Sequence, residues 1–469
     1  MVFTRPLRFV TEFVEAIDGD VRRVDPNGIG LSKAQRWWLS TCIMGVIITN
    51  SVCWARFSRA HLGRYTTAAL CWVFVHAGIA WDALLRASVE TILREHGVTE
   101  GTLVIDDSDK KRSKTTTQIW GVHKIKDKST GGYVQGQSIV LLLLVTPTIT
   151  VPVGFTFYRP DPVLSAWTKK DNELKKKGIA KRNRPTKPER NPAYPTKIEL
   201  ALALIKEFKA NHASVRVKVV LADAAYSTAR FMDVASACFG GIQVIGELRN
   251  NQLVKAPGGN IALAKYFGRR AGVPTVLHIR GRPKQVAVVD SARLYVPCHN
   301  KKRFVVALRY EGEDDYRYIV ASDMTWRTGD IIRTWTLRWL VEVFFQDWKA
   351  YEGWGTLTKQ RGKEGSSRGL ILSLLVDHCL LTHPYQLAQL EYKRPAFTVG
   401  SLTNRIRADA LVMMIRDIAA SDDPEGALEK LGNLLREQFR LRPSEKHMVG
   451  RDLGRQESTP SLKYRAAQA

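Results

Sequence analysis

The fold is decided by the stretch Trp335-Thr-Leu-Arg338-Trp-Leu-Val-Glu342-Val-Phe-Phe-Gln-Asp-Trp-Lys349, which sets Glu342 among basic side chains on a helix otherwise built for burial. At about 100° per residue, Trp335, Arg338, Glu342 and Lys349 would fall within roughly 60° of one another and form one stripe. The apolar remainder of the stretch comprises Leu340, Val341, Phe344, Phe345 and Trp348. We therefore expect a single helix that packs against a core and holds Glu342 rigidly.

Two further acidic segments decide whether this helix is functional. An ordinary surface salt bridge would also place Arg338 and Glu342 four residues apart. However, the chain contains Leu103-Val-Ile-Asp106-Asp107-Ser108 and, later, Val219-Val-Leu-Ala-Asp223-Ala-Ala-Tyr226. Both segments are rich in β-branched residues, so we expect two strands that each carry an Asp at the C-terminal end.

Two aspartates on strands and one glutamate on a helix could form an acidic cluster for divalent cations. Mg²⁺ prefers hard oxygen ligands. Two ions about 3.5 to 4 Å apart can act on both the attacking and the leaving oxygen of a phosphodiester. The pattern therefore indicates phosphoryl transfer.

The spacing Trp335-x2-Arg338-x3-Glu342-x6-Lys349 resembles the Tyr-x2-Arg-x3-Glu-x6-Lys signature of DDE transposases of bacterial insertion sequences, with Trp335 in the Tyr place. Asp106-Asp107-Ser108 resembles the first acidic motif of that family, and Asp223-Ala-Ala-Tyr226 resembles its second. The resemblance covers about residues 100 to 380. It implies an α/β fold: an RNase H-like catalytic core with a β-rich insertion, preceded by an all-α domain and followed by a helical C-terminal region.

The resemblance also implies roles for individual residues. Asp106, Asp223 and Glu342 would bind two Mg²⁺ ions, which Mn²⁺ could replace, while Arg338 and Lys349 would neutralise phosphates. Asp107 remains an alternative metal ligand to Asp106, although the family spacing favours Asp106. Glu247 is a weaker candidate for the third acid. It also follows a strand-like run, but it has no basic residues beside it on a helix, as Glu342 has. The side chains expected to contact DNA are Trp335, Arg338, Lys349, Arg249, Lys110, Lys111 and Arg112.

Composition agrees with a nucleic-acid partner. The chain has 469 residues and a formal charge of +26, with an isoelectric point near 9.9. Such a charge suits binding to a phosphate backbone, although a merely basic or ribosome-associated protein would share it. The apolar share of 45% supports sizeable cores and argues against disorder. The six cysteines lack a Cys-x-x-Cys pair, so we expect cytoplasmic thiols and no zinc finger.

The chain is expected to divide into three parts. Residues 1–97 would form a helical DNA-binding domain, 98–395 the catalytic domain with an insertion at about 226–328, and 396–469 a helical region with a basic tail. The apolar segments 41–55 and 68–85 are shorter than the roughly 20 residues of a membrane span and contain polar residues. We therefore expect buried helices there and no membrane partner.

Several local patterns are specific enough to test. Residues 138–145 and 149–158 predict an antiparallel hairpin around Pro147. The basic, proline-containing segment 169–190 predicts a loop, and Thr196-Lys-Ile-Glu199 predicts a helix capping box. Within the insertion, strands are expected at residues 276–279, 285–289, 303–309 and 316–321.

These expectations combine into one function. The chain would bind double-stranded DNA at the inverted repeats of a mobile element, nick it by hydrolysis, and join the freed 3′-hydroxyl to a target. Such enzymes join two ends, so a homodimer or larger assembly is expected, in the bacterial cytoplasm at the nucleoid. The alternatives are a catalytically inactive DNA-binding descendant and a metal-dependent nuclease without strand transfer.

Overall fold

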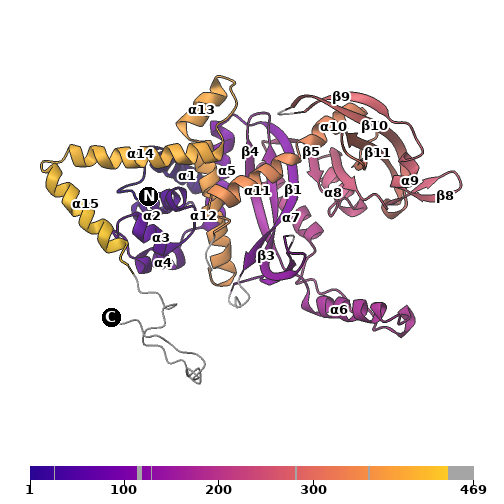
Figure 1. Cartoon of the computed structure of the whole chain (residues 1–469), viewed down its shortest axis with the longest axis horizontal. Helices are drawn as coiled ribbons and strands as arrows, with labels where there is room; N and C mark the ends of the chain where they lie inside the picture. Colours follow the sequence, from indigo (N-terminus) through magenta and orange to yellow (C-terminus); the bar gives the residue numbers. More distant parts are fainter. Residues whose placement is uncertain (26, 113–118, 128, 280–281, 357–359, 442–469) are drawn as a thin grey trace, which may run out of the picture. The chain divides into compact units, whose positions relative to one another are not determined.

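The computed structural model describes residues 1–25, 27–112, 119–127, 129–279, 282–356 and 360–441 (Figure 1). Residues Met1–Asp417 form one compact unit, and a second begins at Ile418. Helix α14 (Val399–Ala419) ends just inside the second unit, which also contains α15 (Pro424–Gln438). The helices expected near the C-terminus are therefore present, whereas most of the expected basic tail lies outside the described residues. The finer division into three domains stays a prediction.

The N-terminal region is helical, as the sequence predicts. Its helices are α1 (Arg8–Val24), α2 (Lys33–Thr49), α3 (Trp54–Ala60), α4 (Thr67–His76) and α5 (Trp81–Glu95). Buried Asp20 on α1 accepts hydrogen bonds from Thr91 and Arg94 on α5, which ties the first helix to the last. Among the described residues, no single helix is long and apolar enough to cross a membrane. The pairs α2/α3 and α4/α5, bent by 89° and 91°, reach that length and hydropathy only together.

Twelve strands of the described chain form one mixed sheet, in the order β2-β3-β1-β5-β6-β12-β11-β10-β7-β8, with β4 on β3 and β9 on β10. The first half comprises β1 (Glu100–Arg112), β2 (His123–Lys126), β3 (Tyr133–Val145), β4 (Thr150–Tyr158) and β5 (Arg216–Ala222). The predicted hairpin is β3–β4 and is confirmed. Strand β1 pairs antiparallel with β3 and parallel with β5, so the sheet is mixed at its centre.

The region expected as an insertion continues this same sheet. Its strands are β6 (Gln243–Leu248), β7 (Leu253–Ala256), β8 (Gly259–Ala262), β9 (Val273–Ile279), β10 (Arg282–Val296), β11 (Lys301–Tyr310) and β12 (Arg317–Ala321). The four predicted strands fall on β9 to β12 and are confirmed. Strand β6 pairs parallel with β5, and β12 pairs antiparallel with β6, so backbone hydrogen bonds run without a break from the aspartate strands into the insertion.

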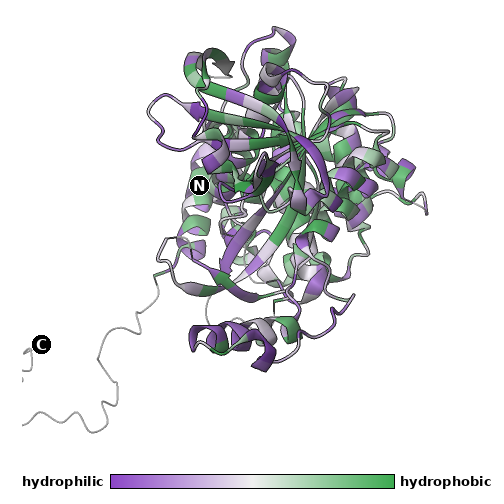
Figure 2. Cartoon of the chain, turned by 90° about the vertical axis from the view of Figure 1, so that its right-hand side faces the viewer, coloured by the Kyte–Doolittle hydropathy of each residue, from purple (hydrophilic) through white to green (hydrophobic). Residues whose placement is uncertain are grey.

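Alternate residues of the central strands face two different cores, as the pleat of a strand requires. Val104 and Leu141 belong to one core, which also contains the N-terminal helices. Leu103 and Val140 belong to the other, which contains α7 (Lys197–Asn211) and α8 (Ala229–Cys238). Figure 2 shows green, hydrophobic stretches along the strands of the sheet, with purple, hydrophilic stretches between them. Each residue of β1 can therefore be assigned to a face.

The predicted capping box at the start of α7 is confirmed. The Thr196 hydroxyl accepts a hydrogen bond from the Glu199 backbone N–H at 3.3 Å, and the Glu199 carboxylate accepts one from the Thr196 N–H at 2.9 Å. Both bonds satisfy donors that a helix N-terminus otherwise leaves without partners.

Thr196→Ala should lower the free energy of unfolding by about 1 kcal/mol, because alanine cannot accept the bond from Glu199. Denaturant unfolding monitored by circular dichroism measures the change. Thr186→Ala is the matched control, since Thr186 is exposed and should change stability by less than about 0.5 kcal/mol. Equal effects of the two substitutions would contradict the role given to the cap.

The helix expected over 335–349 is interrupted. It consists of α10 (Thr328–Thr336) and α11 (Trp339–Tyr351). Between them the backbone N–H of Leu337 and that of Arg338 bond three residues back, to Thr334 and Trp335, as in a 3-10 helix. The prediction of one continuous helix is therefore wrong, because this tightening changes the angular spacing between Trp335 and Glu342.

Two other expectations about local structure are corrected. Strand β1 does not end at its acidic residues but continues to Arg112, because the long strand β3 offers partners along its whole length. The segment expected as a basic loop begins as a helix, α6 (Pro162–Lys176). Asp161 caps it by accepting hydrogen bonds from the N–H groups of Val163 and Leu164, and only the proline-containing half beyond it is irregular.

A buried acidic pair lies where α11 meets α12 (Gly362–Leu381). Glu352 is fully buried, and among the described residues neither of its carboxylate oxygens has a hydrogen-bond partner. Burial and the neighbouring charges of Asp377 and Asp347 raise the pKa of Glu352 well above its usual range. Burial and the charge of Asp347 likewise raise the pKa of Asp377. The folded chain therefore holds protons here that the unfolded chain releases near pH 4 to 5.

This pair predicts a pH-dependent loss of stability. Since the folded pKa is raised, each group makes folding less favourable by about 1.4 kcal/mol per pH unit as the pH rises from the unfolded to the folded pKa. Glu352→Gln stays neutral and should gain stability relative to the natural chain between pH 5 and 8, as measured by thermal unfolding. Exposed Glu391→Gln is the control. A constant difference between the Glu352→Gln variant and the natural chain over this range would contradict the prediction.

Candidate active site

The candidate site lies where two neighbouring strands separate. The parallel pairing of β1 and β5 ends at the pair Ile105 and Ala222. Asp106 and Asp223 are the next residues on the two strands, so the topology sets the two acids side by side at this fork. Asp223 thus follows the end of its strand as predicted, whereas Asp106 is an interior residue of β1.

Asp106 is buried on the face of the sheet that carries α11. Its side chain accepts hydrogen bonds from the Asp107 backbone N–H at 2.7 Å and from the Arg338 guanidinium at 3.0 Å. Burial, followed by the negative charge of Asp223, raises the pKa of Asp106 to about 7, although Arg338 opposes this rise. Burial and the neighbouring Asp223 therefore both disfavour the ionised form of Asp106.

Asp107 points to the opposite face, as the alternation of a strand requires. There its carboxylate binds the Lys197 ammonium at 2.6 Å and accepts a hydrogen bond from the Tyr226 hydroxyl at 3.4 Å. Tyr226 is fully buried, and burial together with the three nearby aspartates raises its pKa. Lys197 was missed by sequence reasoning, because a lysine in the first turn of a capped helix carries no signal of a contact about 90 residues earlier.

Asp223 opens a tight turn that positions the second motif. Its carboxylate accepts a hydrogen bond from the Ala225 N–H at 2.9 Å, and its backbone carbonyl accepts one from the Ser227 hydroxyl at 2.8 Å. Burial and the charge of Asp107 raise the pKa of Asp223, which the Ala225 hydrogen bond and Arg338 oppose. The Ser227 hydroxyl also accepts the backbone N–H of Glu247 at 2.9 Å, so this turn is fixed to strand β6.

Arg338 links the helix to the strands. Its guanidinium lies 3.0 Å from Asp106 and 3.9 Å from the Glu342 carboxylate, so a single positive charge sits beside both acids. Arg338 also lies over the ring of Trp335, 5.5 Å from its centre. Trp335 is 7% exposed and belongs to the core, so the expectation that it contacts DNA is not supported; it packs against Arg338 instead.

Two glutamates flank the aspartates. Glu342 is 45% exposed in its side chain and lies on α11 near Arg338. Glu247 lies on β6, where burial raises its pKa, while Arg338 and Arg317 oppose the rise and Asp223 adds to it. Both rivals for the third acid thus reach the electrostatic neighbourhood of Arg338, and position alone does not choose between them.

The carboxylates of the site have the chemistry that a divalent cation requires, but their side chains are not arranged around a common point that could hold one. Carboxylates are hard oxygen donors, and a cation would relieve the repulsion that helps raise the pKa values of Asp106 and Asp223. Within the part of the chain that the structure describes, no three His, Cys, Asp or Glu side chains are arranged so that they could hold a metal ion. Arg338 explains part of this, because its guanidinium neutralises Asp106 directly.

The other residues expected to bind DNA differ in their surroundings. Lys110 is partly buried and donates to the Gly355 carbonyl, and burial lowers its pKa to about 8. Lys111 pairs with Asp127 at 2.6 Å, and Arg112 donates to Gln137 at 2.8 Å. Arg249 is exposed just after β6, and Lys349 is exposed on α11, with its ammonium 5.3 Å from the centre of the Phe345 ring. The last two are therefore more accessible to a ligand than the three residues of β1.

A mixed sheet with helices packed on it and two acidic residues at a strand fork is consistent with the fold of a DDE nuclease. The sequence profile of the DDE superfamily endonucleases matches residues 56–304, more than half of the chain, so the chain belongs to this family. The match includes Asp106, Asp223 and Glu247 but ends before Arg338 and Glu342. Nucleases of this family typically use divalent metal ions.

The remaining comparisons are more distant. A solved structure, the piggyBac transposase synaptic complex with hairpin DNA, is similar at 9% sequence identity with a TM-score of 0.45. The similarity covers 98% of this chain and 86% of that one. No curated protein matches the sequence.

Proposed function

We propose that this chain is a DNA transposase, which cleaves the ends of a mobile element and joins them to a target. The observation that carries the proposal is the strand fork, where Asp106 and Asp223 lie side by side and the charge of Asp223 adds to the rise in the pKa of Asp106. An acidic cluster of this kind, in a chain that belongs to the DDE endonucleases, is suited to phosphodiester chemistry. The chain would recognise these ends by binding their inverted repeats.

In the proposed mechanism, Asp106, Asp223 and Glu342 hold two divalent ions, with Mg²⁺ preferred and Mn²⁺ as a substitute. When bound, such ions lower the pKa of the attacking water or hydroxyl and stabilise the leaving oxygen. Asp107 remains a second candidate ligand from β1, although Lys197 already neutralises it. Arg338 lies close to both Asp106 and Glu342, so it would bind a phosphate oxygen of DNA placed at this site, since guanidinium groups pair well with phosphates.

Binding of the double-stranded substrate is assigned to exposed basic residues. Arg249 and Lys349 flank the fork and would contact the phosphates nearest to it. The N-terminal helices would bind the inverted repeat. Since two ends must be joined, the active form would be a homodimer or a larger assembly, working at the bacterial nucleoid in the cytoplasm.

The proposal is tested with DNA that carries the terminal inverted repeat from beside the gene, in the presence of Mg²⁺ or Mn²⁺. The purified chain should nick this DNA at the element's end, and Asp223→Asn should bind the DNA equally well but not cut it. Asp330→Asn is the matched control, because Asp330 is 48% exposed at the start of α10 and pairs only with Arg333.

The products distinguish the alternatives. Joining of a labelled end to a second DNA molecule supports a transposase, whereas nicking without joining indicates a nuclease that lacks strand transfer. If the natural chain binds the repeat but never cuts it with either metal, the catalytic proposal is wrong and a DNA-binding descendant takes its place.

A further inference from the structure

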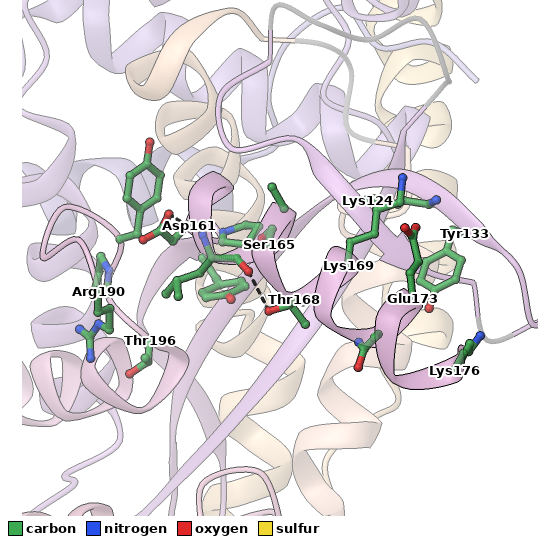
Figure 3. Close-up of a pocket in the computed structure, with 17 residues that line it drawn as sticks. Lys124, Tyr133, Asp161, Ser165, Thr168, Lys169, Glu173, Lys176, Arg190 and Thr196 are labelled. Carbon is green, nitrogen blue, oxygen red and sulfur yellow. Dashed lines mark hydrogen bonds between the residues drawn. The ribbon is translucent and has the colours of Figure 1, made fainter. Parts of the chain in front are cut away.

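A cavity of about 850 Å³ lies next to the start of helix α7, where Thr196 lines it, and none of the roles described so far uses it (Figure 3). Its walls come from four segments: the paired strands β2 and β3, the end of β4 with Pro160, helix α6 with its cap, and the chain from Arg190 to Thr196. Figure 3 shows Lys124, Tyr133, Lys169 and Glu173 gathered at one end, with Arg190 and Thr196 at the other. Its volume falls in the range of about 300 to 1,000 Å³ that is typical of ligand pockets.

Helix α6 contributes to this cavity but not to the protein core. None of its residues is buried, and in Figure 1 it extends away from the sheet. Local bonds hold it in place, including the Asp161 cap, the Asp171–Arg184 ion pair at 2.9 Å, and the Trp167 indole donating to the Pro185 carbonyl. Only one side of the helix is half-buried, at Leu164, Trp167, Asp171 and Leu174, so most of its surface is open to a ligand.

The helix and the loop that follows it are strongly basic. Residues 162–190 contain ten lysines and arginines against three acids. At the cavity, Lys124, Lys169 and Lys176 are exposed, and no ion pair is seen for them within the described part of the chain. Of the acids lining the cavity, Asp161 is occupied by capping α6, which leaves Glu173 as an exposed opposing charge. The cavity therefore favours an anionic ligand.

Aromatic rings distinguish this cavity from a simple basic surface. Tyr133, Tyr158 and Tyr194 line it, each with a cation over its ring: Lys124 at 4.8 Å, Lys197 at 5.3 Å and Arg159 at 4.4 Å. Tyr133 is 63% exposed, so its ring is not part of the core. Aromatic rings can stack on the bases of a single strand, and the neighbouring cations can bind its phosphates. In a duplex the faces of the bases are covered by the neighbouring base pairs and are not available for stacking.

Lys197 connects the cavity to the acid cluster. Its ammonium binds Asp107 at 2.6 Å and also lies over Tyr158, a residue of the cavity wall. Thr196, the preceding residue, lines the cavity as well. A strand held in the cavity would therefore come close to Asp107, the residue that follows Asp106 on β1.

From these contacts we propose that the cavity binds an unpaired strand of the DNA substrate beside the cleavage site. Bases stack on the free faces of Tyr133, Tyr158 and Tyr194, while Lys124, Lys169 and Lys176 bind the phosphates. The proposal rests on the proposed function, because it assigns the strand to that reaction. It adds a substrate requirement: the DNA next to the cut is opened, and the opened strand enters this site.

The test measures binding of a fluorescein-labelled oligothymidine by anisotropy, without metal so that no cleavage occurs. Tyr133→Ala should weaken binding about tenfold, the loss typical of one stacked base. Lys169→Ala and Lys176→Ala should each make the dependence of affinity on salt less steep, by about 0.7 in the logarithmic slope. All three side chains are exposed, so the variants should fold normally.

Matched controls lie outside the cavity. Tyr392→Ala removes a tyrosine that is 71% exposed, and Lys206→Ala removes an exposed lysine of α7; both should bind oligothymidine as the natural chain does. As a second measurement, 5-iododeoxyuridine placed in the oligonucleotide should form photo-crosslinks to the cavity tyrosines, located by mass spectrometry. Unchanged affinity in Tyr133→Ala, or crosslinks confined to other regions, would overturn the proposal.

These outcomes can be separated from a failure of the proposed function. If the natural chain does not cut repeat DNA but Tyr133→Ala loses oligothymidine binding, the cavity binds single strands and only the assigned reaction is wrong. If the natural chain cuts DNA and Tyr133→Ala binds oligothymidine normally, the cavity proposal alone fails.

Discussion

Replacing Asp106 with asparagine is expected to lower metal-dependent DNA cleavage by about a thousandfold or more, while DNA binding persists. Asparagine preserves the size of the side chain but removes the charge at the centre of the strand fork. Arg338 and the Asp107 N–H both donate to this carboxylate, so the substitution also removes one acceptor oxygen. A rate loss of a thousandfold corresponds to about 4 kcal/mol of lost transition-state stabilisation, the size expected for removing a central charged group.

A stability measurement separates this loss from misfolding. The pKa of Asp106 is raised to about 7, above its unfolded value near 4, so its ionisation makes folding less favourable as the pH rises between these values. Asp106→Asn cannot ionise and should gain stability relative to the natural chain over the same range without metal. Asp330→Asn should follow the natural chain in both stability and cleavage. Cleavage by Asp106→Asn near the natural rate would contradict the assignment of Asp106.

The strands of this fold could be predicted because their signals are local. The hairpin of β3 and β4, the cap at Thr196 and the strands β9 to β12 each follow from alternation, proline or capping residues within a short stretch. Predictions failed where tertiary contacts override local signals. Strand β1 extends beyond its acids because β3 supplies partners, and α6 forms in a segment whose charges and prolines favour a loop.

In the candidate site, too, the features with local sequence signals could be predicted and those set by tertiary contacts could not. Asp106 and Asp223 could be predicted from their motifs, and strand alternation correctly separates Asp107 from Asp106. Lys197 and Tyr226 could not be assigned to Asp107 from the sequence, since only the packing of α7 on the sheet brings Lys197 to β1. The break between α10 and α11 was equally hidden, because Leu337 and Arg338 keep helical torsion angles while the hydrogen bonds shift.

The identity of the third acid is the second prediction with a large expected effect. Glu342→Gln is expected to reduce cleavage more than about a hundredfold, because Glu342 shares Arg338 with Asp106 and is exposed enough to turn toward a cation. Glu247→Gln should cost about tenfold or less, the effect typical of a residue that only supports a metal ligand. The backbone N–H of Glu247 bonds to Ser227 and is unchanged by this substitution, so the replacement removes only a charge near Arg338.

Measurements of metal binding show which of Glu342 and Glu247 is the ligand, without depending on DNA cleavage. Calorimetric titration with Mn²⁺ should show weaker binding in Glu342→Gln and nearly natural binding in Glu247→Gln, with exposed Glu391→Gln as the control. The reverse order would make Glu247 the third ligand and leave Glu342 as an ion-pair partner of Arg338. That result would move the catalytic set entirely into residues 56–304, where the family profile matches, and α11 would then serve to carry Arg338 to the fork.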